Sequence, residues 1–503
     1  MKVVSLTMYT PSRLILINID ALRPDMFEQA LLDNAIPNLA RLVGGPNIDK
    51  GLKFAPASTA PSITFCSQAS IITGAHPKDH GITGNQYFDR LGRISGEPRH
   101  YAFDAGGHRL ALDDALNVFR NALADRALSP EVETIYETAK KHGLSSTVVF
   151  HMFARGADHW IKPGMDDWRE FFSFGESFGI SSEKYDRRMV DETIRHLREG
   201  ARPDLLHLYF WGLDHDSHTH GPLIQYPYLT DTVDPLIGDL IRELEALDMM
   251  DDSLFVIFSD HGQIEVPSES QYCLQLAFPP LDIGLGHVFK ALKRDVLNVP
   301  GETGMDTVLS MNGALSHVYV RRKLGRWKTP ARFDKDVMPV AAAFWEGATI
   351  GKYFSPLYNA LNMILVRDCE QGGWDTPFLA YTPGGCVPVE EYLADRPAIQ
   401  SLDGINRLSH LAGVNSGDLL LLSNIEEGYY FAFPYKGIHG SLHPQDSLSM
   451  LSYSLPGGTE EQIRQLQGRI GGAIEARCKR ENDRYVNIAD IHTGLMAAMG
   501  WAA

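Results

Sequence analysis

The segment LDHDSHTHGP combines aspartate and histidine side chains at an uncommon density, with Asp214 and His218 four residues apart. Carboxylate oxygens and imidazole nitrogens are ligands that zinc and its first-row neighbours accept in proteins. A solvated histidine-rich loop is the alternative interpretation of the same residues. The density of ligand types favours a metal site over that alternative.

Two further segments carry the same ligand types. SDHG has Asp260 and His261 side by side after a strongly apolar run, and GIHGSLHP has His439 between glycines, which let a backbone approach closely. Neighbouring side chains diverge in a regular strand, but a turn after the strand can direct both toward one ion or let each serve one of two ions. His439 alone is a weak indication, so it gains weight only from the other segments.

The candidate nucleophile, Thr64, lies in the stretch APSITFCSQASIITGAHPKDHGITGN. Thr64 and Ser62 precede a predicted helix over residues 65–73. Free N–H groups and the helix dipole favour an anion such as phosphate at a helix N-terminus. Helix capping is a far commoner role for such hydroxyl groups than catalysis, so the catalytic interpretation depends on the metal-ligand segments. We interpret the neighbouring Cys66 as a packing residue.

Short apolar runs must position these side chains. LILINID, LLHLYFWGLD and LFVIFSD each predict a buried strand, and they end at Asp20, Asp214 and Asp260. Apolar residues at spacings of three and four over residues 236–247 predict a crossover helix. This alternation predicts a doubly wound α/β fold, with a mostly parallel central sheet and helices on both faces. Functional groups gather outside the carboxyl ends of such strands, so the three aspartates can share one site, with helix capping as the alternative for each.

We interpret the whole chain, residues 1–503, as one catalytic domain. TVVF and DLLLLS predict two further buried strands, and NIADIHTGLMAAMG predicts a closing helix. From about residue 264 to about residue 417 the pattern is irregular, with proline, glycine, aromatic residues and strand-like fragments such as ALSHVYV. This stretch predicts an insertion that contains a cap.

Composition and charge narrow the class of protein. A chain of 503 residues that is 44% apolar can bury a large core, which is typical of a globular enzyme. Its net charge is −17 and it has no long run of lysine or arginine, which argues against bulk nucleic acid as a partner. Bound metal ions can still concentrate positive charge at one point and so admit a small phosphate ester.

The cysteines and the N-terminal region bear on the compartment. The five cysteines are scattered without a CxxC pair, and LILINI is too short to span a bilayer. These features predict a cytoplasmic protein without a membrane partner. They carry no indication of oligomeric state.

The order of the motifs is strand with aspartate, helix with hydroxyl, Asp-x-x-x-His, Asp-His, and a late isolated histidine. This order resembles the alkaline phosphatase superfamily, in particular its nucleotide pyrophosphatase/phosphodiesterase and phosphonoacetate hydrolase branches. The resemblance extends from Asp20 to the final helix after His439. It implies two divalent metal ions, zinc first, with manganese or iron as alternatives. One ion would be held by Asp20, Asp260 and His261 and would contact Thr64, and the other by Asp214, His218 and His439.

The same resemblance implies a role for Asn85. Asn85 ends the motif GITGN, which is similar to the family's GxxGN, and would donate a hydrogen bond to a non-bridging phosphate oxygen. A nearby dication favours loss of the Thr64 proton, and the oxyanion can then attack phosphorus to form a phospho-enzyme intermediate. The prediction is therefore a two-metal hydrolase of phosphoric esters of the phosphodiesterase or nucleotide pyrophosphatase type, with a small phosphate- or phosphonate-containing substrate.

The chain also departs from the family pattern. The phosphodiesterase branch typically has Lys before the nucleophile and Pro-Asn-His after the following Phe, whereas this chain has Ile63 before Thr64 and Cys-Ser-Gln after Phe65. Nucleotide specificity is thus left open.

The stretch FHMFARGADHW offers His151 and Arg155 as a cationic clamp for a doubly charged phosphate. Such a clamp would favour the alternative functions, a phosphonate hydrolase or a phosphomonoesterase. An ordinary ion pair is the alternative interpretation of Arg155. A catalytically silent binding protein of the same fold is the remaining alternative.

Overall fold

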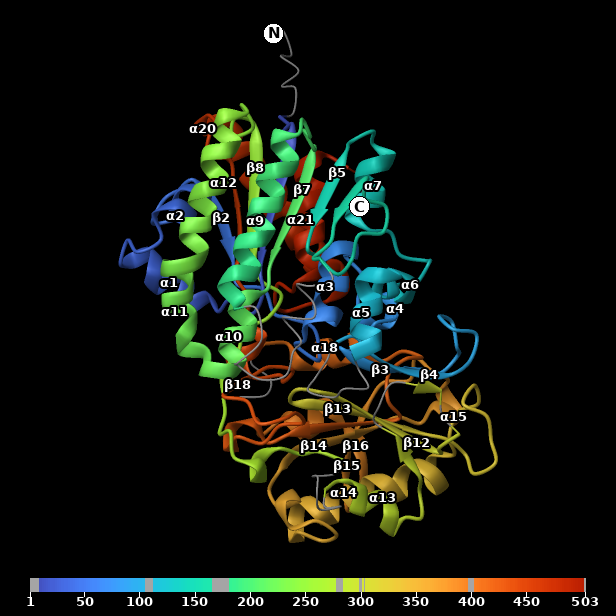
Figure 1. Cartoon of the computed structure of the whole chain (residues 1–503). Coiled ribbons are helices and arrows are strands. Elements are labelled where there is room, and N and C mark those ends of the chain that lie inside the picture. The colour runs from blue at the N-terminus through green and yellow to red at the C-terminus, as the bar shows by residue number, and fades with distance from the viewer. Residues whose placement is uncertain are drawn as a thin grey trace.

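The computed structural model describes residues 9–104, 112–164, 181–276, 284–297, 301–302, 304–396 and 402–501. Its main sheet has seven strands in the order β2-β19-β8-β1-β7-β5-β6 (Figure 1). Strands β8, β1, β7, β5 and β6 run parallel, while β19 and β2 form an antiparallel edge. The bounds are β1 Arg13–Ile19, β2 Gly51–Phe54, β5 Ser146–Val149, β6 His159–Ile161, β7 Leu205–Phe210, β8 Ser253–Phe258 and β19 Leu451–Ser454.

Both faces of this sheet are buried, as the apolar runs predict. In β1, Leu14 and Leu16 belong to one core cluster, while Ile15, Ile17 and Ile19 belong to the other. Successive strand side chains point to opposite faces, so a run that is apolar throughout needs a helix layer on each side. This arrangement confirms the predicted doubly wound α/β fold.

The two helix layers alternate along the chain and lie on opposite faces of the sheet. In Figure 1, α9 and α12 lie in front of the sheet and α20 and α21 lie behind it. The first layer contains α1 Pro24–Leu32, α2 Pro37–Leu42, α9 Ser182–Arg198 and α12 Asp234–Ala246. The second contains α3 Thr64–Thr73, α7 Ile135–Lys141, α20 Glu460–Glu481 and α21 Ala489–Met499. Thus α12 matches the predicted crossover helix and α21 the predicted closing helix.

A second seven-stranded sheet, in the order β10-β12-β13-β17-β14-β15-β16, lies below the first in Figure 1. Helices α13 and α14 pack on one face, and α16 and α18 pack on the other. The strands are β10 Val296–Leu297, β12 Thr307–Asn312, β13 Leu315–Val320, β14 Leu361–Val366, β15 Leu379–Thr382, β16 Gly385–Pro388 and β17 Leu419–Ser423. The helices are α13 Gly286–Ala291, α14 Met338–Ile350, α16 Val389–Leu393 and α18 Gly404–Leu411.

The second sheet refines two expectations. The stretch that looks irregular in sequence carries six of its strands, because antiparallel strands joined by variable loops leave little periodicity. DLLLLS forms β17, which pairs with β13 and β14 and not with the main sheet. An apolar run shows that a strand is buried but not which sheet it joins.

The remaining short elements include a three-stranded sheet, β11-β4-β3, and a two-stranded sheet, β18-β9. They are α4 Pro77–His80, β3 Gln86–Asp89, β4 Arg99–Ala102, α5 Leu112–Arg120, α6 Leu123–Ala127, α10 Gly212–His220, α11 Gln225–Tyr228, β9 Ile264–Glu265, β11 Gly301–Glu302, α15 Cys369–Gly372, β18 Gly437–Ile438 and α19 Pro444–Ser447. Among the described residues, every helix is too short or too polar to cross a lipid bilayer.

Candidate active site

The predicted metal ligands gather at the carboxyl ends of three adjacent parallel strands. Asp20 follows β1 directly, and Asp260 and His261 come shortly after β8. Asp214 lies in the first turn of α10, the helix after β7, and not at the strand end as LLHLYFWGLD suggests. Because α10 is helical, His218 lies one turn further along the same face. The strand order β8-β1-β7 thus brings these segments together.

His439 reaches the same place from the far end of the chain. It follows β18, and Gly440 after it has a φ of +102°. A side chain at Gly440 would come within 2.2 Å of the Asn312 carbonyl oxygen, so only glycine lets this segment lie against the end of β12. The glycine after His439 therefore serves close backbone approach.

The first ligand group consists of Asp20, Asp260 and His261, all fully buried. His261 Nε2 lies 3.4 Å from Asp20 Oδ1 and 3.6 Å from Asp260 Oδ2. Those two carboxylate oxygens accept no hydrogen bond from the described residues. Two neighbouring buried carboxylates with unpartnered oxygens are the arrangement that a bound cation would complete.

The second ligand group consists of Asp214, His218 and His439. Asp214 Oδ2 lies 3.4 Å from His218 Nε2, and Asp214 Oδ1 lies 3.7 Å from His439 Nε2. The two imidazole Nε2 atoms are 3.2 Å apart. The rings of His261 and His439 stack at 3.9 Å, so the two groups form one continuous site.

Backbone carbonyls set the tautomers of the three histidines. Nδ1 of His218 lies 2.7 Å from the Gly437 oxygen, Nδ1 of His439 lies 3.0 Å from the Ser62 oxygen, and Nδ1 of His261 lies 3.0 Å from the Gly262 oxygen. A carbonyl oxygen only accepts, so each Nδ1 must donate its proton. Each Nε2 then offers a lone pair to the site, which is the form that binds metal.

The electrostatics follow from burial and like charges. Burial and the neighbouring Asp260 and Asp214 raise the pKa of Asp20 well above its ordinary value. Burial opposes ionisation of Asp214, but His218 and His439 hold its pKa far below the ordinary range. Within the described ranges, neither Asp20 nor Asp260 forms an ion pair with lysine or arginine. The donor set of carboxylate oxygens and imidazole nitrogens fits divalent zinc and its neighbours.

Thr64 is the first residue of α3, and its Oγ1 lies 3.1 Å from His261 Nε2. The capping position belongs to Ile63, which forms no side-chain cap. The helix-capping alternative therefore does not describe what the Thr64 hydroxyl does. Cys66, one turn into the helix, is fully buried, and burial raises the pKa of its thiol to about 12, which suits a packing residue.

Asn85 is locked beside Thr64 in one orientation. Its Oδ1 accepts the backbone N–H of Phe65 at 2.9 Å, and its Nδ2 donates to Asp104 Oδ2 at 3.1 Å. One N–H of the Asn85 amide is left for a ligand at the start of α3. Asp104 was not foreseen, because only the pairing of β3 with β4 brings it next to Asn85.

A sequence profile of the type I phosphodiesterase / nucleotide pyrophosphatase family matches residues 14–349. The chain belongs to this family. The match confirms the resemblance that the order of the motifs indicates. Asp20, Thr64, Asp214 and the pair Asp260–His261 lie inside the matched range, and His439 lies after it.

A relative in Schizosaccharomyces pombe, an uncharacterized pyrophosphatase/phosphodiesterase, is 26% identical over 254 residues. The match covers 50% of this chain but only 44% of the relative, so it spans less than half of that protein's length.

Solved structures with a similar fold include murine ectonucleotide pyrophosphatase/phosphodiesterase 5, an inactive threonine-to-alanine variant in complex with AMP. It superposes with a TM-score of 0.51 at 13% identity, over 98% of this chain and 96% of that one. The human protein of the same name superposes with a TM-score of 0.50 at 14% identity, over 94% and 96%. At these identities the likeness shows the fold.

Arg155 does not join the ligand groups of this phosphodiesterase-family chain. Its guanidinium lies 3.2 Å from a Glu137 carboxylate oxygen and donates to the carbonyl oxygens of Ser129 and Val132. These partners surround the start of α7 and use the guanidinium within the protein. These contacts favour the ion-pair alternative for Arg155 over the predicted clamp.

His151 is likewise occupied. It is fully buried, with Nε2 3.0 Å from Gln68 Oε1 and Nδ1 3.0 Å from the Phe153 carbonyl oxygen. Burial lowers its pKa to about 4, so it carries no charge at neutral pH. These contacts and the lowered pKa do not favour a cationic role for His151.

Two further polar residues support the ligands and were missed from the sequence. The Tyr209 hydroxyl donates to Asp20 Oδ2, and Gln263 Nε2 donates to Asp214 Oδ1 at 2.7 Å. The register of β1 with β7 pairs Asn18 with Tyr209 and so brings the hydroxyl near the end of β1. Tyrosine in an apolar strand and glutamine in a loop are common, so neither indicates a site on its own.

Proposed function

We propose that the chain hydrolyses phosphoric diesters or pyrophosphates through Thr64, with one divalent metal ion at each of the two ligand groups. One observation carries the proposal: the Thr64 hydroxyl lies 3.1 Å from His261 Nε2, where the two ligand groups meet. A hydroxyl at a helix N-terminus next to six convergent donors is suited to attack on phosphorus.

The ligand assignment follows the two groups. Asp20, Asp260 and His261 would hold one ion, and Asp214, His218 and His439 the other. The ions, zinc with manganese or iron as alternatives, would supply positive charge that offsets the buried carboxylates and favours loss of the Thr64 proton. His261 lies against both groups, which supports a shared cleft over two independent sites.

The chain's own residues would divide the reaction in two. The Thr64 oxygen, having lost its proton, attacks phosphorus. The bond to the leaving oxygen breaks, the leaving group takes up a proton, and the rest of the substrate, with its phosphorus, is esterified to Thr64. Water then hydrolyses that ester and restores the hydroxyl. The Asn85 amide would hold a non-bridging oxygen, and the N-terminal N–H groups of α3 favour the anion throughout.

Charge in the cleft supports a diester over a monoester. The Asp104 carboxylate lies 3.1 Å from the Asn85 amide nitrogen, while Arg155 is bound to Glu137. A diester carries one negative charge where a monoester carries two, so it is repelled less by Asp104. Phosphonate and monoester hydrolysis stay as alternatives without the clamp that would favour them.

The substrate and the compartment are proposed more coarsely. The AMP complex of the murine relative supports including nucleotide diesters among the test substrates. A cytoplasmic location stays a prediction from the scattered cysteines, all five of which are free. We make no proposal on oligomeric state.

The decisive experiment is capture of the intermediate. Purified enzyme is mixed with an aryl diester, quenched in acid within one turnover, digested and analysed by mass spectrometry. We expect a phosphoryl ester on the peptide that contains Thr64. A control enzyme with a known acyl or phosphoryl ester intermediate shows that the quench traps such esters. If the present enzyme turns over substrate and the Thr64 peptide is not modified, the proposed nucleophile is wrong.

A substrate panel run with metal quantification tests the remaining part. Aryl diester, aryl monoester, phosphonoacetate and nucleotide diesters are compared at equal enzyme concentration, and bound metal is counted in the same preparation. We expect the diesters to lead. A protein that holds no metal after gentle purification and turns over no substrate would support the silent binding protein instead.

A further inference from the structure

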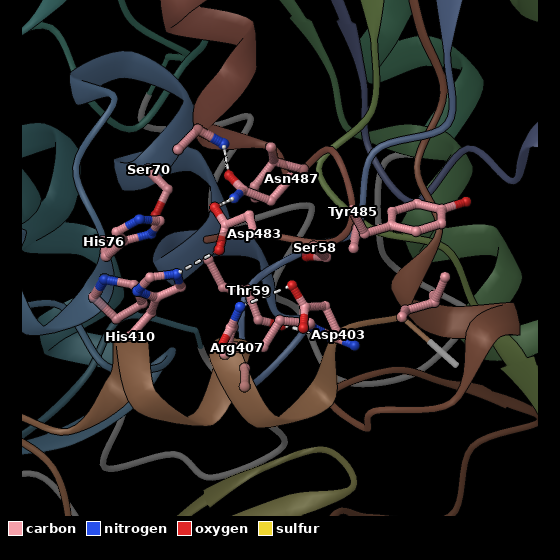
Figure 2. Close-up of a pocket in the computed structure, with 17 residues that line it drawn as sticks. Ser58, Thr59, Ser70, His76, Asp403, Arg407, His410, Asp483, Tyr485 and Asn487 are labelled. Carbon is pink, nitrogen blue, oxygen red and sulfur yellow. Dashed lines mark hydrogen bonds and ion pairs between the residues drawn. The ribbon is translucent and has the colours of Figure 1, made fainter. Parts of the chain in front are cut away.

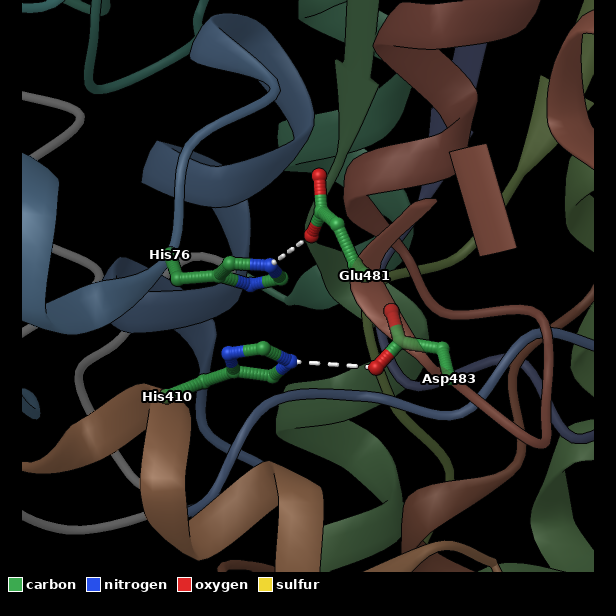
Figure 3. A group of neighbouring side chains, drawn as sticks. All are labelled: His76, His410, Glu481 and Asp483. Atoms are coloured by element: carbon green, nitrogen blue, oxygen red, sulfur yellow. Dashed lines mark hydrogen bonds and ion pairs between the residues drawn. The ribbon is translucent and has the colours of Figure 1, made fainter. Parts of the chain in front are cut away.

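Outside the active site, another group of side chains that can bind a metal consists of His76, His410, Glu481 and Asp483 (Figure 3). His76 Nε2 lies 2.9 Å from Glu481 Oε2, and His410 Nε2 lies 3.1 Å from Asp483 Oδ1. One ligand atom of each residue lies within 4.8 Å of the other three. Figure 3 shows the two rings stacked, with the same edge of each directed at the carboxylates.

The four residues come from three distant parts of the chain. His76 is the N-cap of α4 and follows the end of α3, the helix that starts with Thr64. His410 lies in the last turn of α18, Glu481 is the last residue of α20, and Asp483 follows two residues later. These residues lie close together only in the folded chain. A ligand that contacts all four would therefore bind the folded chain and not the unfolded one.

The charges in this group do not balance. Arg477 contacts Glu481, Asp483 and Asp490 at 3.0, 3.2 and 3.2 Å. One guanidinium against three carboxylates leaves two negative charges when both histidines are neutral. Asp483, Asp490 and Arg477 are at most 3% exposed, so water screens them poorly. Arg480 approaches Glu481 at 3.6 Å from a 67% exposed position, where an ion pair contributes little.

Protonation of both histidines is an unfavourable way to balance this charge. The rings of His76 and His410 stack with centroids 3.5 Å apart and planes 6° apart, so two imidazolium charges would repel each other face to face. His76 Nε2 lies 3.0 Å from Arg477 Nη2 and 2.9 Å from Glu481 Oε2, so it accepts from the guanidinium in one tautomer and donates to the carboxylate in the other. In the first tautomer the lone pair of His76 Nε2 lies next to a carboxylate oxygen of Glu481, and a metal ion can bind both atoms.

We propose that His76, His410, Glu481 and Asp483 bind one divalent ion of the zinc type. Two imidazole nitrogens and two carboxylate oxygens suit zinc and its first-row neighbours, and a double positive charge matches the excess of two negative charges. The ion would join the end of α3 to α18 and α20, and Arg477 would keep Asp490 as a partner. The two rings must tilt from their stack for both lone pairs to meet at one ion.

A neighbouring pocket gives such an ion access. Figure 2 shows both histidines on one side of a pocket, with Asp483 directed toward His410. The side chains of His76 and His410 are 12% and 15% exposed, so solvent reaches them. The site is therefore largely enclosed but not sealed, and it has room for a water ligand.

The test counts bound ions. The wild type and His410→Ala are stripped with chelator, dialysed against buffered Zn²⁺ and analysed for zinc per chain. We expect the variant to hold one ion fewer, whatever number the catalytic cleft holds. The control, His159→Ala, removes an exposed histidine whose ring contacts that of His196, outside the group of four ligands, and it should leave the count unchanged. Equal counts in the wild type and His410→Ala would overturn the proposal.

Glu481→Gln decides the matter if His410→Ala does not fold. Glu481 is 28% exposed and glutamine keeps its size, so the variant should fold while losing an anionic ligand. In competition with a zinc indicator, we expect the affinity of one site to fall by about 100-fold or more, because even supporting residues around a metal typically contribute 10–100-fold. An unchanged affinity for every bound ion would show a plain ion-pair network.

Melting temperature separates the two kinds of site. Zn²⁺ should raise the Tm of the stripped wild type more than that of Glu481→Gln, because the ion binds only the folded chain. Equal Zn²⁺-dependent shifts in the two proteins would contradict a stabilising ion at this position. Diester hydrolysis is measured on both proteins as well. Equal activity would show that the catalytic ions are bound alike in both, so that a difference in Tm comes from the second site.

Discussion

The two groups of histidine and carboxylate side chains differ in how the protein balances their charge. Around His261, the buried Asp20 and Asp260 form no ion pair with lysine or arginine among the described residues. Around His76 and His410, Arg477 contacts three carboxylates. In the proposed function, bound cations supply the counter-charge around His261, whereas Arg477 partly balances the carboxylates around His76 and His410. The residue types of the ligands are the same in both places. The presence or absence of an arginine that pairs with the carboxylates distinguishes them.

The same comparison bears on the predicted clamp. Arg155 is matched by Glu137 within the protein, so its charge is not available to a substrate. A charged side chain that is paired with an opposite charge within the protein contributes to the structure. A buried charged side chain without such a partner is a candidate for binding a ligand. The variants below test this distinction, from the largest expected effect to the smallest.

Thr64→Ala should give the largest loss. We expect kcat/KM on diesters to fall by roughly 10⁴-fold or more, because removal of a catalytic nucleophile costs that much in other hydrolases. Metal content should stay at the wild-type value, since Thr64 supplies no charge to the ligand groups. Thr64→Ser, which keeps the hydroxyl, is the matched control and should retain measurable turnover. Full activity in Thr64→Ala would remove the basis for the whole site.

Asn85→Ala should lower kcat by about 10²- to 10³-fold, the range found for loss of one oriented donor to a transition-state oxygen. The Asn85 amide also caps the Phe65 N–H, so circular dichroism and melting temperature must show that α3 is intact. A loss confined to KM would indicate that Asn85 holds the ground state and not the transition state.

Gln263→Ala should weaken binding of one cleft ion by about 10- to 100-fold, because Gln263 orients Asp214 without binding the ion itself. Added metal should restore much of the activity. This rescue separates a supporting residue from a ligand. Activity that does not respond to metal would contradict the supporting role.

Asp104→Asn tests the charge argument for diesters. We expect the ratio of monoester to diester kcat/KM to rise several-fold, because a second negative charge on the substrate no longer meets a carboxylate beside Asn85. The hydrogen bond to Asn85 can be kept by the new amide oxygen. An unchanged ratio would mean that Asp104 does not select substrates.

Arg155→Ala should have the smallest effect on catalysis. We expect kcat/KM for monoester and diester to change by less than about twofold, with a loss of about 1 kcal/mol in the free energy of unfolding from its hydrogen bonds near α7. Denaturant unfolding and the two assays check both parts. A monoester activity that disappears in this variant would restore the clamp.

Four of the seven strands of the main sheet could be predicted from the sequence because each is a short apolar run, and three of these runs end near a ligand residue. LILINID and LFVIFSD match β1 and β8, and TVVF matches β5. The second sheet could not be predicted in the same way. Its strands are separated by loops of uneven length, and β17 carries the same apolar pattern as a main-sheet strand while pairing with β13 and β14.

For the site, the sequence identified residues whose type suits metal, and the structure brings all six predicted ligands into contact. It could not foresee that Asp214 lies on a helix, that Asp104 lies beside Asn85, or that Arg155 bonds to Glu137. Each of these depends on a partner distant in the chain or on the local backbone path.

The sequence alone determined what each side chain can donate, accept or carry as charge, and which short runs must be buried. Covalent composition and local hydrophobic period are properties of neighbouring residues, so they can be read without the fold. The tertiary structure alone decided which charges meet a counter-charge. Strand order and loop packing bring distant residues to within a few ångströms, and electrostatic energy falls with distance, so the difference between a structural arginine and an open metal site arises only in the folded chain.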